Sequence, residues 1–249
     1  MPDIWPVFHV PHDGDQFPEE LMSSVCVPHA QFFAYHRMMR DTGVLELVPR
    51  IYQNLEHTVS FPVSRLLCDV ERFLGREEVM EEYGMGFCYE RAYDGTVIKL
   101  VTDELKEKTL RYYREHHARM DQLCREHEQV VAFDLHSYSD EIVPRSLRKY
   151  GVNMPDICIG TDACFTPEPL AESVEQRFRE AGFSTIRNEP YSGCFVPNAV
   201  LSGECQGCSI MLEIHKRCYC DGASQPNLVQ CERIRSVIDQ IASDALKML

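Results

Sequence analysis

The feature that most constrains this chain is the run VVAFDLHSYSD at residues 130–140, where an apolar strand pattern ends in polar groups. Asp134, His136 and Ser137 are costly to bury unless something pairs with them or uses them. A short apolar run closed in this way predicts a buried strand of an open α/β sheet, and such sheets bind ligands at the carboxyl ends of their strands. Because Asp134 and His136 are two residues apart, a regular strand points both to one face.

Strand and helix patterns alternate along the chain. Strand-like runs are predicted at residues 4–10, 62–73, 130–137, 156–162 and 208–216, with a hairpin at 87–100. Helical spacing is predicted at residues 30–40, 43–55, 102–129, 166–182 and 227–249, with Pro49 interrupting the second helix and Thr166-Pro167 opening the fourth. The alternation predicts an α/β fold with a mostly parallel or mixed central sheet and helices on both faces.

Length and charge narrow the class of protein. A chain of 249 residues suits one large α/β domain, so a single domain over residues 1–249 is expected. Acidic residues outnumber basic ones 39 to 25, for a formal net charge of -14. Phosphate backbones are bound by concentrated Lys and Arg, so nucleic acid is not an expected partner.

The remaining composition bears on compartment and cysteine chemistry. No basic leader is present at the N-terminus, and no stretch approaches the roughly 20 apolar residues of a membrane span. A cytoplasmic protein with no membrane partner is therefore expected, and its twelve cysteines are expected to remain thiols. The pairs Cys205 with Cys208 and Cys218 with Cys220 leave a structural zinc site open as an alternative.

Polar groups close four of the predicted strands or follow them directly. They are His12 with Asp15, Asp69 with Glu71 and Arg72, Asp134 with His136, and Glu213. Two histidines and a carboxylate leave one zinc coordination position open to water, which is typical of a hydrolytic site. Zinc lowers the pKa of such a water to about 7, and a nearby glutamate can act as the base. Glu213 fits that role.

Asp134 and Ser137, at the end of the run at residues 130–140, allow alternative interpretations. Asp134 is a plausible hydrogen-bonding partner that orients His136, or else it caps a neighbouring loop or pairs with a surface arginine. Ser137 is a candidate nucleophile, but the sequence contains no Gly-x-Ser-x-Gly motif to support one. The metal hypothesis is therefore favoured over a serine hydrolase.

Several short motifs together resemble the N-formylglutamate amidohydrolase family. They are PHDG at 11–14, SRLLCDVERF at 64–73, GMGFCYERAYDG at 84–95, DLHS at 134–137, NEPYSGCF at 188–195 and LEIHKRCYCD at 212–221. The resemblance covers nearly the whole chain and implies a metal-dependent amidohydrolase with a fold similar to zinc carboxypeptidases and aspartoacylases. The implied reaction is hydrolysis of an N-acyl amino acid, with N-formyl-L-glutamate the first candidate, giving formate and L-glutamate in histidine catabolism.

The resemblance also assigns metal ligands. His12 and His136 match the metal-binding histidines, and Glu213 matches the glutamate that activates water and carries the proton. Related enzymes use a His-x-x-Glu motif where this chain has His12-x-x-Asp15, whereas Asp41 matches an acidic position that recurs in the family. We expect one of Asp15 and Asp41 to bind a single zinc ion, with another divalent metal as an open alternative.

A second motif concerns the substrate carboxylate. The segment from Asp69 to Arg72 resembles an Asp-x-Asn-Arg segment whose Asn-Arg pair holds that carboxylate, but Glu71 replaces the asparagine here. Arg72 can form a bidentate pair with a carboxylate, and a buried structural salt bridge is its alternative role. Glu71 would repel the anion unless it faces away or binds Arg65. Asp69 is expected to support the residues of the site through hydrogen bonds without binding the metal itself.

Two further segments are candidate substrate contacts. Asn188 and Tyr191 resemble the family's Asn-x-Pro-Tyr-Ser-Gly-Gly loop, with Cys194 in place of the second glycine. Such a loop either presents donors to an oxyanion or a carboxylate, or is a structural turn. If the strand continues past Glu213, Arg217 shares its face and is a second candidate cation, with a solvated surface arginine as the alternative.

The expected partner is a small anionic N-acyl amino acid. Two other functions remain open on the sequence alone. One is a carboxypeptidase-like hydrolase of a short peptide or cell-wall fragment. The other is a non-catalytic protein that binds an acyl amino acid, which the replacements Glu71 and Cys194 would suit.

Overall fold

The computed structural model describes residues 4–75, 77–142, 154–221 and 225–248. The chain forms two compact units, each assembled from separate segments. The first, called here the sheet unit, comprises residues 1–10, 41–59 and 120–249, and the second, the loop-rich unit, comprises residues 11–40 and 60–119. The expectation of one domain over the whole chain stays a prediction.

A six-stranded sheet dominates the sheet unit, with strand order β2-β1-β3-β6-β4-β5. The strands are β1 (Ile4–Val10), β2 (Thr58–Ser60), β3 (Gln129–Tyr138), β4 (Ile157–Gly160), β5 (Thr185–Arg187) and β6 (Gln206–His215). β1 with β3, β3 with β6, and β4 with β5 are parallel, whereas β4 and β6 are antiparallel. The sheet is therefore mixed, which confirms the predicted fold class.

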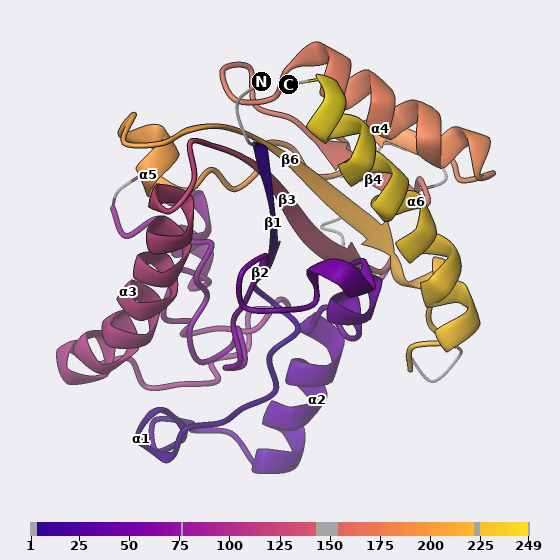
Figure 1. The fold of residues 1–249 in the computed structure, drawn as a ribbon. Helices are drawn as coiled ribbons and strands as arrows, with labels where there is room; N and C mark the ends of the chain where they lie inside the picture. The colour runs from indigo at the N-terminus through magenta and orange to yellow at the C-terminus, as the bar shows by residue number, and fades with distance from the viewer. Residues whose placement is uncertain (1–3, 76, 143–153, 222–224, 249) are drawn as a thin grey trace. The chain divides into compact units, whose positions relative to one another are not determined.

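Helices cover both faces of this sheet (Figure 1). On one face, α4 (Glu168–Glu180) packs against α6 (Leu228–Met248) over Phe8, Phe133 and Leu212. On the other, α5 (Asn198–Leu201) and the C-terminal end of α3 (Asp103–Arg125) cover Val7 and Val130. Because successive side chains of a strand alternate between faces, both faces of β1 and β3 carry apolar residues near the start of each strand.

The loop-rich unit contains little regular structure. Its helices are α1 (Glu19–Met22), α2 (His29–Met39), the 3-10 turn η3 (Val79–Tyr83) and the first part of α3. Its strand pairing, among the described residues, consists of isolated bridges such as Gln16 with Val63 and Arg91 with Val97. The predicted hairpin at 87–100 is therefore a turn around Gly95, with φ of 86°, closed by one bridge.

Two predicted elements are wrong. The helix expected at 43–55 is a pair of 3-10 turns, η1 (Val44–Leu47) and η2 (Arg50–Tyr52), because Pro49 between them supplies no N–H and its ring blocks a continuous helix. The strand expected at 62–73 is a series of turns in which only Val63 forms a bridge. These turns place Asp69 in the interior of the loop-rich unit, where its side chain is fully buried.

Smaller differences concern the ends of elements. α4 has no side-chain cap, because its N-cap residue is Pro167 and not Thr166 as predicted. The Thr166 hydroxyl instead accepts from the N–H of Asp162 and donates to the carbonyl of Ser209. The short strands β2 and β5 were not predicted, since three residues carry too little periodicity. In the described part of the chain, no helix combines the length and apolar character needed to cross a bilayer.

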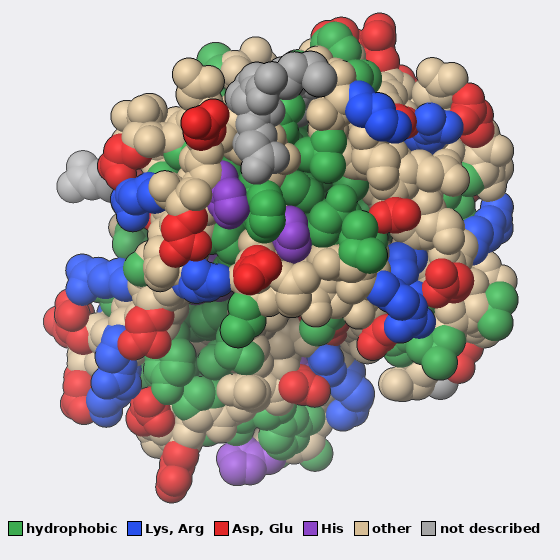
Figure 2. All heavy atoms as spheres, in the orientation of Figure 1, with side chains coloured by type: hydrophobic (Ala, Val, Ile, Leu, Met, Phe, Trp, Pro, Cys, Tyr) green, Lys and Arg blue, Asp and Glu red, His purple; other side chains and the backbone are tan. Residues whose placement is uncertain are grey.

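The surface charge agrees with the acidic composition. On the face drawn in Figure 2, Asp and Glu side chains are interspersed with Lys and Arg, and the described basic side chains do not gather into one patch. Binding of a phosphate backbone relies on such a gathering. The absence of a nucleic-acid partner stays a prediction, and the charge distribution on this face is compatible with it.

Candidate active site

Sheet register places four titratable side chains on one face of the sheet. His9 on β1 is paired with Asp134 on β3, and His136 on β3 is paired with Glu213 on β6. All four side chains are buried and lie on the face opposite the core formed under α4 and α6. The structure thus brings Asp134, His136 and Glu213 together as the sequence predicted, and adds His9.

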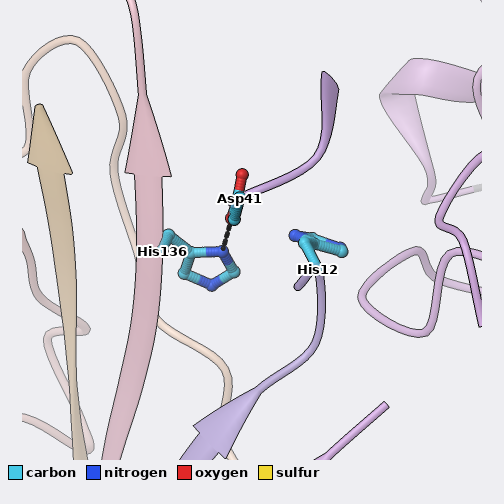
Figure 3. Close-up of side chains that lie close together, drawn as sticks. All are labelled: His12, Asp41 and His136. Carbon is cyan, nitrogen blue, oxygen red and sulfur yellow. Dashed lines mark hydrogen bonds and ion pairs between the residues drawn. The ribbon is translucent and has the colours of Figure 1, made fainter. Parts of the chain in front are cut away.

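His136 lies between two carboxylates of the sheet unit. Its Nδ1 is 3.2 Å from Oδ2 of Asp41 (Figure 3), and its Nε2 is 3.0 Å from Oδ1 of Asp134. The three side chains are buried, with exposed fractions of 4% for His136, 3% for Asp41 and 2% for Asp134. Water therefore screens these contacts little.

Asp134 is the fixed partner in this group. Its Oδ1 also accepts a hydrogen bond from Nδ1 of His9 at 2.9 Å, and its Oδ2 accepts one from the backbone N–H of Phe195 at 2.9 Å. Burial alone would raise the pKa of Asp134, but the contacts with His136 and His9 hold it well below the usual range. Asp134 is therefore an ionised acceptor, and both histidines must donate to it.

This assignment leaves the other nitrogen of His136 directed at Asp41. A neutral His136 that donates from Nε2 has a lone pair at Nδ1, and this lone pair faces the Asp41 oxygen at 3.2 Å. Two acceptors at that separation repel unless a proton or a cation lies between them. Two zinc ligands with bonds of about 2.0–2.1 Å in tetrahedral geometry lie about 3.3 Å apart. The donor types, spacing and burial therefore fit a divalent metal.

Glu213 lies beside His136 on the neighbouring strand. β6 pairs it with His136 on one side, and β4 pairs it with Cys158 on the other. Burial raises the pKa of Cys158 to about 12, with Glu213 contributing, so this neighbour is a neutral thiol. Ser137, the alternative nucleophile, alternates to the opposite face of β3 and does not belong to this group.

Arg217 does not share the strand face of Glu213, and that expectation is wrong. β6 ends at His215, and Arg217 lies in the following 3-10 turn η4 (Lys216–Cys218). Its Nη2 donates to the carbonyl of Met154 at 2.6 Å and lies 3.0 Å from Asp156. With 42% of its side chain exposed, Arg217 matches the alternative of a surface arginine in an ion pair.

The loop that follows β5 is held by its asparagine. Asn188 has φ of 54°, its Oδ1 accepts from the N–H of Thr161 at 2.9 Å and of Gly193 at 3.3 Å, and its Nδ2 donates to the Thr161 hydroxyl at 2.8 Å. The Tyr191 ring packs edge-on against Tyr138, with centroids 5.7 Å apart. These contacts of Asn188 are those expected of the structural-turn alternative, and a role in substrate binding stays a prediction.

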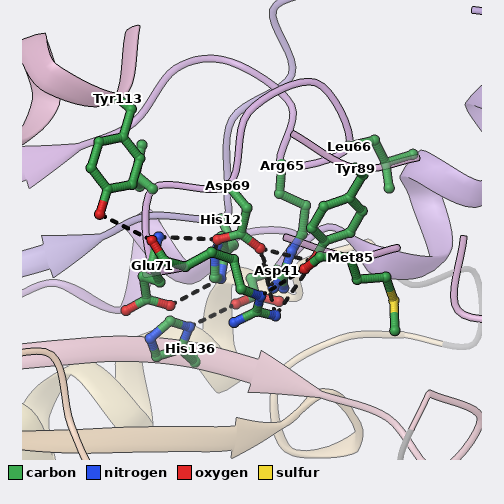
Figure 4. Close-up of polar contacts among 12 residues, drawn as sticks. His12, Asp41, Arg65, Leu66, Asp69, Glu71, Met85, Tyr89, Tyr113 and His136 are labelled. Atoms are coloured by element: carbon green, nitrogen blue, oxygen red, sulfur yellow. Dashed lines mark hydrogen bonds and ion pairs between the residues drawn. The ribbon is translucent and has the colours of Figure 1, made fainter. Parts of the chain in front are cut away.

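A second buried carboxylate organises the loop-rich unit. Asp69 accepts hydrogen bonds from Nε2 of His12 at 2.9 Å, Nη2 of Arg65 at 3.0 Å and the Tyr89 hydroxyl at 2.8 Å (Figure 4). Nη2 of Arg72 lies 3.6 Å from the same carboxylate. Burial would raise the pKa of Asp69, but Arg72, His12 and Arg65 hold it well below the usual range. Asp69 is therefore ionised.

The two arginines are only partly occupied by Asp69. One carboxylate neutralises one of the two guanidinium charges, and the side chains of Arg65 and Arg72 remain 14% and 21% exposed. The sequence analysis expected Glu71 either to face away from the substrate anion or to bind Arg65. In the structure, Oε2 of Glu71 lies 3.5 Å from Nδ1 of His12. Arg72 thus forms the structural salt bridge while its side chain stays partly exposed.

The environments of Asp15 and Asp41 differ. Asp15 is 63% exposed and forms an ion pair with Arg40 at 3.2 Å. Asp41 is buried against His136. Between the two alternatives for the third ligand, burial and spacing favour Asp41.

The cysteine motifs do not gather into a metal site. Cys205 belongs to the core under α5, whereas Cys208 belongs to the core on the opposite face of the sheet. Burial raises the pKa of Cys208 and Cys218 to about 12. All twelve cysteines are free thiols, and within the described ranges none belongs to a group of three close metal-ligating side chains.

Sequence reasoning missed His9 and the N–H of Phe195. The alternation in β1 offered a signal for His9, because Phe8 and Val10 face one core and a histidine on the other face needs a partner. The partner itself depends on the pairing of β1 with β3. No residue type marks the N–H of Phe195, because every non-proline residue has one.

Comparison with known proteins agrees with this fold. The family model for N-formylglutamate amidohydrolase matches residues 6–220. The crystal structure of N-formylglutamate amidohydrolase from Ralstonia eutropha JMP134 superimposes with a TM-score of 0.78 at 21% identity, covering 100% of this chain and 95% of that chain. At that identity the likeness shows the fold. No curated protein sequence matches the chain.

A more distant structure is that of a bacteriophage poly-gamma-glutamate hydrolase, with a TM-score of 0.33 and 13% identity over 52% of this chain and 58% of that one. A TM-score this low says nothing about the fold. The likeness to zinc carboxypeptidases and aspartoacylases that the sequence resemblance implies therefore stays a prediction. The match to the family model, over residues 6–220, covers most of the sequence by itself. The chain therefore belongs to the N-formylglutamate amidohydrolase family and is an amidohydrolase of that type.

Proposed function

We propose that the protein hydrolyses the amide bond of a small anionic N-acyl amino acid, with N-formyl-L-glutamate as the first substrate, and that it requires one divalent metal ion. The observation that carries this proposal is the buried pair of Asp41 Oδ2 and His136 Nδ1 at 3.2 Å, with Asp134 occupying the other ring nitrogen. A carboxylate that fixes the far nitrogen of a metal-binding histidine is common in zinc sites. The proposed setting is histidine catabolism in the cytoplasm.

Asp41 and His136 are the proposed ligands in the sheet unit. His12 is proposed as a further ligand from the sequence resemblance, supported by its own burial and by the hydrogen bond from its Nε2 to Asp69. Mixed imidazole and carboxylate ligands favour zinc, although availability can load other metals. When bound, zinc polarises a carbonyl group and lowers the pKa of water to about 7.

Glu213 is the proposed general base. It takes a proton from the attacking water, whose oxygen bonds to the acyl carbon, and then gives that proton to the nitrogen as the carbon–nitrogen bond breaks. The products are formate and L-glutamate when the substrate is N-formyl-L-glutamate. Its place beside His136 in the sheet register supports the assignment, because the base must lie near the metal ligands.

The proposed anchor for the substrate carboxylate is Arg72, with Arg65 beside it. Both side chains are partly exposed, at 21% for Arg72 and 14% for Arg65, while they share the charge of Asp69, and a guanidinium binds a carboxylate through two parallel hydrogen bonds. Glu71 is directed at His12, which reduces its conflict with an anion at the arginines. In the sheet unit, Asn188 shapes the loop that follows β5, Tyr191 is kept as a candidate contact, and Arg217 is a weaker one because Asp156 holds it.

The first test combines elemental metal analysis of the purified protein with an assay of formate release from N-formyl-L-glutamate before and after chelation. About one metal ion per chain, with formate release lost on chelation and restored by zinc, is the expected result. Bound metal without formate release would reject this substrate and direct the assay to other N-acyl amino acids and short peptides. A protein that binds no metal after reconstitution would overturn the metallohydrolase proposal.

A further inference from the structure

His9 is a buried titratable residue that the proposed reaction does not use. Its side chain is 0% exposed, and its Nδ1 lies 2.9 Å from Oδ1 of Asp134. The same oxygen accepts a hydrogen bond from Nε2 of His136 at 3.0 Å. One carboxylate oxygen thus joins His9 on β1 to His136 on β3, and the parallel register of the two strands places His9 directly opposite Asp134.

The donors around Asp134 restrict its rotation. Two imidazole N–H groups meet at Oδ1, and the N–H of Phe195 binds Oδ2 at 2.9 Å. A carboxylate with donors on both oxygens cannot turn without losing at least one hydrogen bond, and inside a protein that bond is not replaced by water. His9 and the Phe195 N–H therefore hold the plane in which Asp134 meets His136.

The same residues connect the loop after β5 to this carboxylate. The Phe195 ring packs on His9, with centroids 4.2 Å apart and planes at 32°. The Phe195 carbonyl accepts a hydrogen bond from the Ser209 hydroxyl on β6. The end of the loop that begins at Asn188 is thus held by His9 on one side and by the sheet on the other.

We propose that His9 is a positioning residue: by donating its Nδ1–H to Asp134, it fixes the tautomer and ring plane of His136, so that Nδ1 of His136 is presented toward Asp41. In its last step this inference rests on the proposed function, because a metal is what would use that nitrogen. The positioning of the His136 ring does not depend on a metal and is tested separately.

Substitutions at His9 separate the hydrogen bond from simple packing. In His9→Asn the side-chain N–H occupies the place of Nδ1–H but much of the ring volume is lost, whereas His9→Leu fills more of the volume and has no donor. His9→Gln has a donor, but displaced by one carbon to the place of Nε2. Positioning predicts that Asn preserves the state of His136 and that Leu and Gln do not, and a packing role predicts that Leu is the least disruptive.

A second histidine of the sheet unit offers the matched control. His57 places its Nδ1 2.8 Å from the Pro6 carbonyl and stacks on Trp5 at 4.2 Å, and Asp134 is not its partner. His57→Asn and His57→Leu are expected to leave His136 unchanged. They also report the general effect of removing a packed histidine beside this sheet.

The experiment measures histidine ring ¹⁵N chemical shifts of the full, metal-free chain, with the His136 signals identified by their loss in His136→Gln. Wild type and His9→Asn are expected to show His136 protonated at Nε2, and His9→Leu and His9→Gln to show a mixture of tautomers. Wild-type shifts for His136 in both His9→Leu and His9→Gln would overturn the proposal. If one of these two variants does not fold, the other decides.

Zinc affinity, measured by competition with a coloured chelator, tests the final step. His9→Leu is expected to weaken zinc binding about 10–100-fold, as loss of outer hydrogen bonds does in other metal sites, and His9→Asn is expected to stay closer to wild type. If wild type binds no zinc but His136 still responds to His9, the proposed function fails and the positioning role stands. If zinc binds equally in all variants while the ring shifts change, the last step of the proposal is wrong.

Discussion

The two units each contain a buried aspartate at the centre of a polar network, but the networks differ in their charges. Asp134 in the sheet unit is surrounded by two histidines and a backbone N–H. Asp69 in the loop-rich unit is surrounded by two guanidiniums, a histidine and the Tyr89 hydroxyl. Arginine is always protonated, whereas imidazole exchanges protons and binds metals.

The difference teaches which chemistry each network suits. Donors that are not permanently charged leave the imidazole of His136 available for a cation, so the sheet-unit network suits metal binding and proton transfer. Fixed positive charge that one carboxylate only partly neutralises suits the binding of an anion, so the loop-rich network suits recognition of a substrate carboxylate. Substitutions that change turnover in one network and binding in the other test this division.

The largest effect is expected for Glu213→Gln. The variant keeps the shape of the side chain but cannot accept the proton, so kcat for formate release should fall about 10²–10⁴-fold. KM and metal content should change little, since the substrate carboxylate and the metal have other partners. Steady-state kinetics and elemental analysis of wild type and variant measure both.

Glu172→Gln on the exposed surface of α4 is the matched control and should behave as wild type. An equal loss of activity in both variants would indicate a general defect. Unchanged turnover in Glu213→Gln would remove the proposed base and with it the role of the sheet unit in proton transfer. Binding of substrate with no turnover in either protein would favour the non-catalytic alternative.

The next largest effect is expected on stability. Asp69→Asn removes the fully buried carboxylate that Arg65 and Arg72 share, and breaking a buried ion pair from one side costs about 3–5 kcal/mol. The free energy of unfolding, measured by urea titration, should fall by about this amount. Glu82→Gln, an exposed carboxylate of the same unit, should change it by less than about 0.5 kcal/mol. Equal stabilities of Asp69→Asn and wild type would show that the arginines do not depend on Asp69.

Acid unfolding provides a related prediction. The folded-state pKa of both Asp69 and Asp134 lies below the unfolded value of about 3.9. Their contribution to stability is therefore complete above that pH and is lost as the pH falls through the folded-state values. The free energy of unfolding should decline below about pH 4, less steeply in Asp69→Asn than in wild type. Parallel curves for the two proteins would contradict the lowered pKa of Asp69.

The sequence predicted the sheet unit better than the loop-rich unit, and the reason is physical. The period of two residues in VVAFDLHS is a local property, so the sequence alone places Asp134 and His136 on one face of a strand. The contact between His9 and Asp134 spans 125 residues of sequence, and only strand register reveals it.

In the loop-rich unit, no such period exists. The segment around Asp69 looks like a strand because it is apolar, yet it forms turns whose shape follows side-chain contacts, such as the N–H of Glu71 donating to Asp69 at 3.1 Å. Its motif is identified only by family resemblance. The residues proposed to bind the substrate carboxylate are therefore those that physical reasoning from the sequence could least predict.

Substitution of Arg72 tests the recognition role directly. Arg72→Met keeps much of the stem but removes the charge, and loss of a charge-assisted hydrogen bond of about 1.5–3 kcal/mol should raise KM about 10–100-fold. kcat should change less, because the reacting groups lie in the other network. Arg72→Lys retains the charge without the planar fork and should give an intermediate KM. A fall in kcat at unchanged KM would reverse the proposed division between the networks.

The smallest effect is expected for Asp15→Asn, and it separates the two aspartates left open by the sequence. Asp15 is 63% exposed in its pair with Arg40, and exposed pairs contribute at most about 1 kcal/mol, so neither stability nor metal content should change much. Asp41→Asn removes the negative charge of the buried carboxylate whose Oδ2 lies 3.2 Å from His136 Nδ1 and should lower zinc affinity. If Asp15→Asn lowered zinc affinity more than Asp41→Asn, Asp15 would be the metal ligand. The His-x-x-acid spacing would then identify the ligand, and burial beside His136 would not.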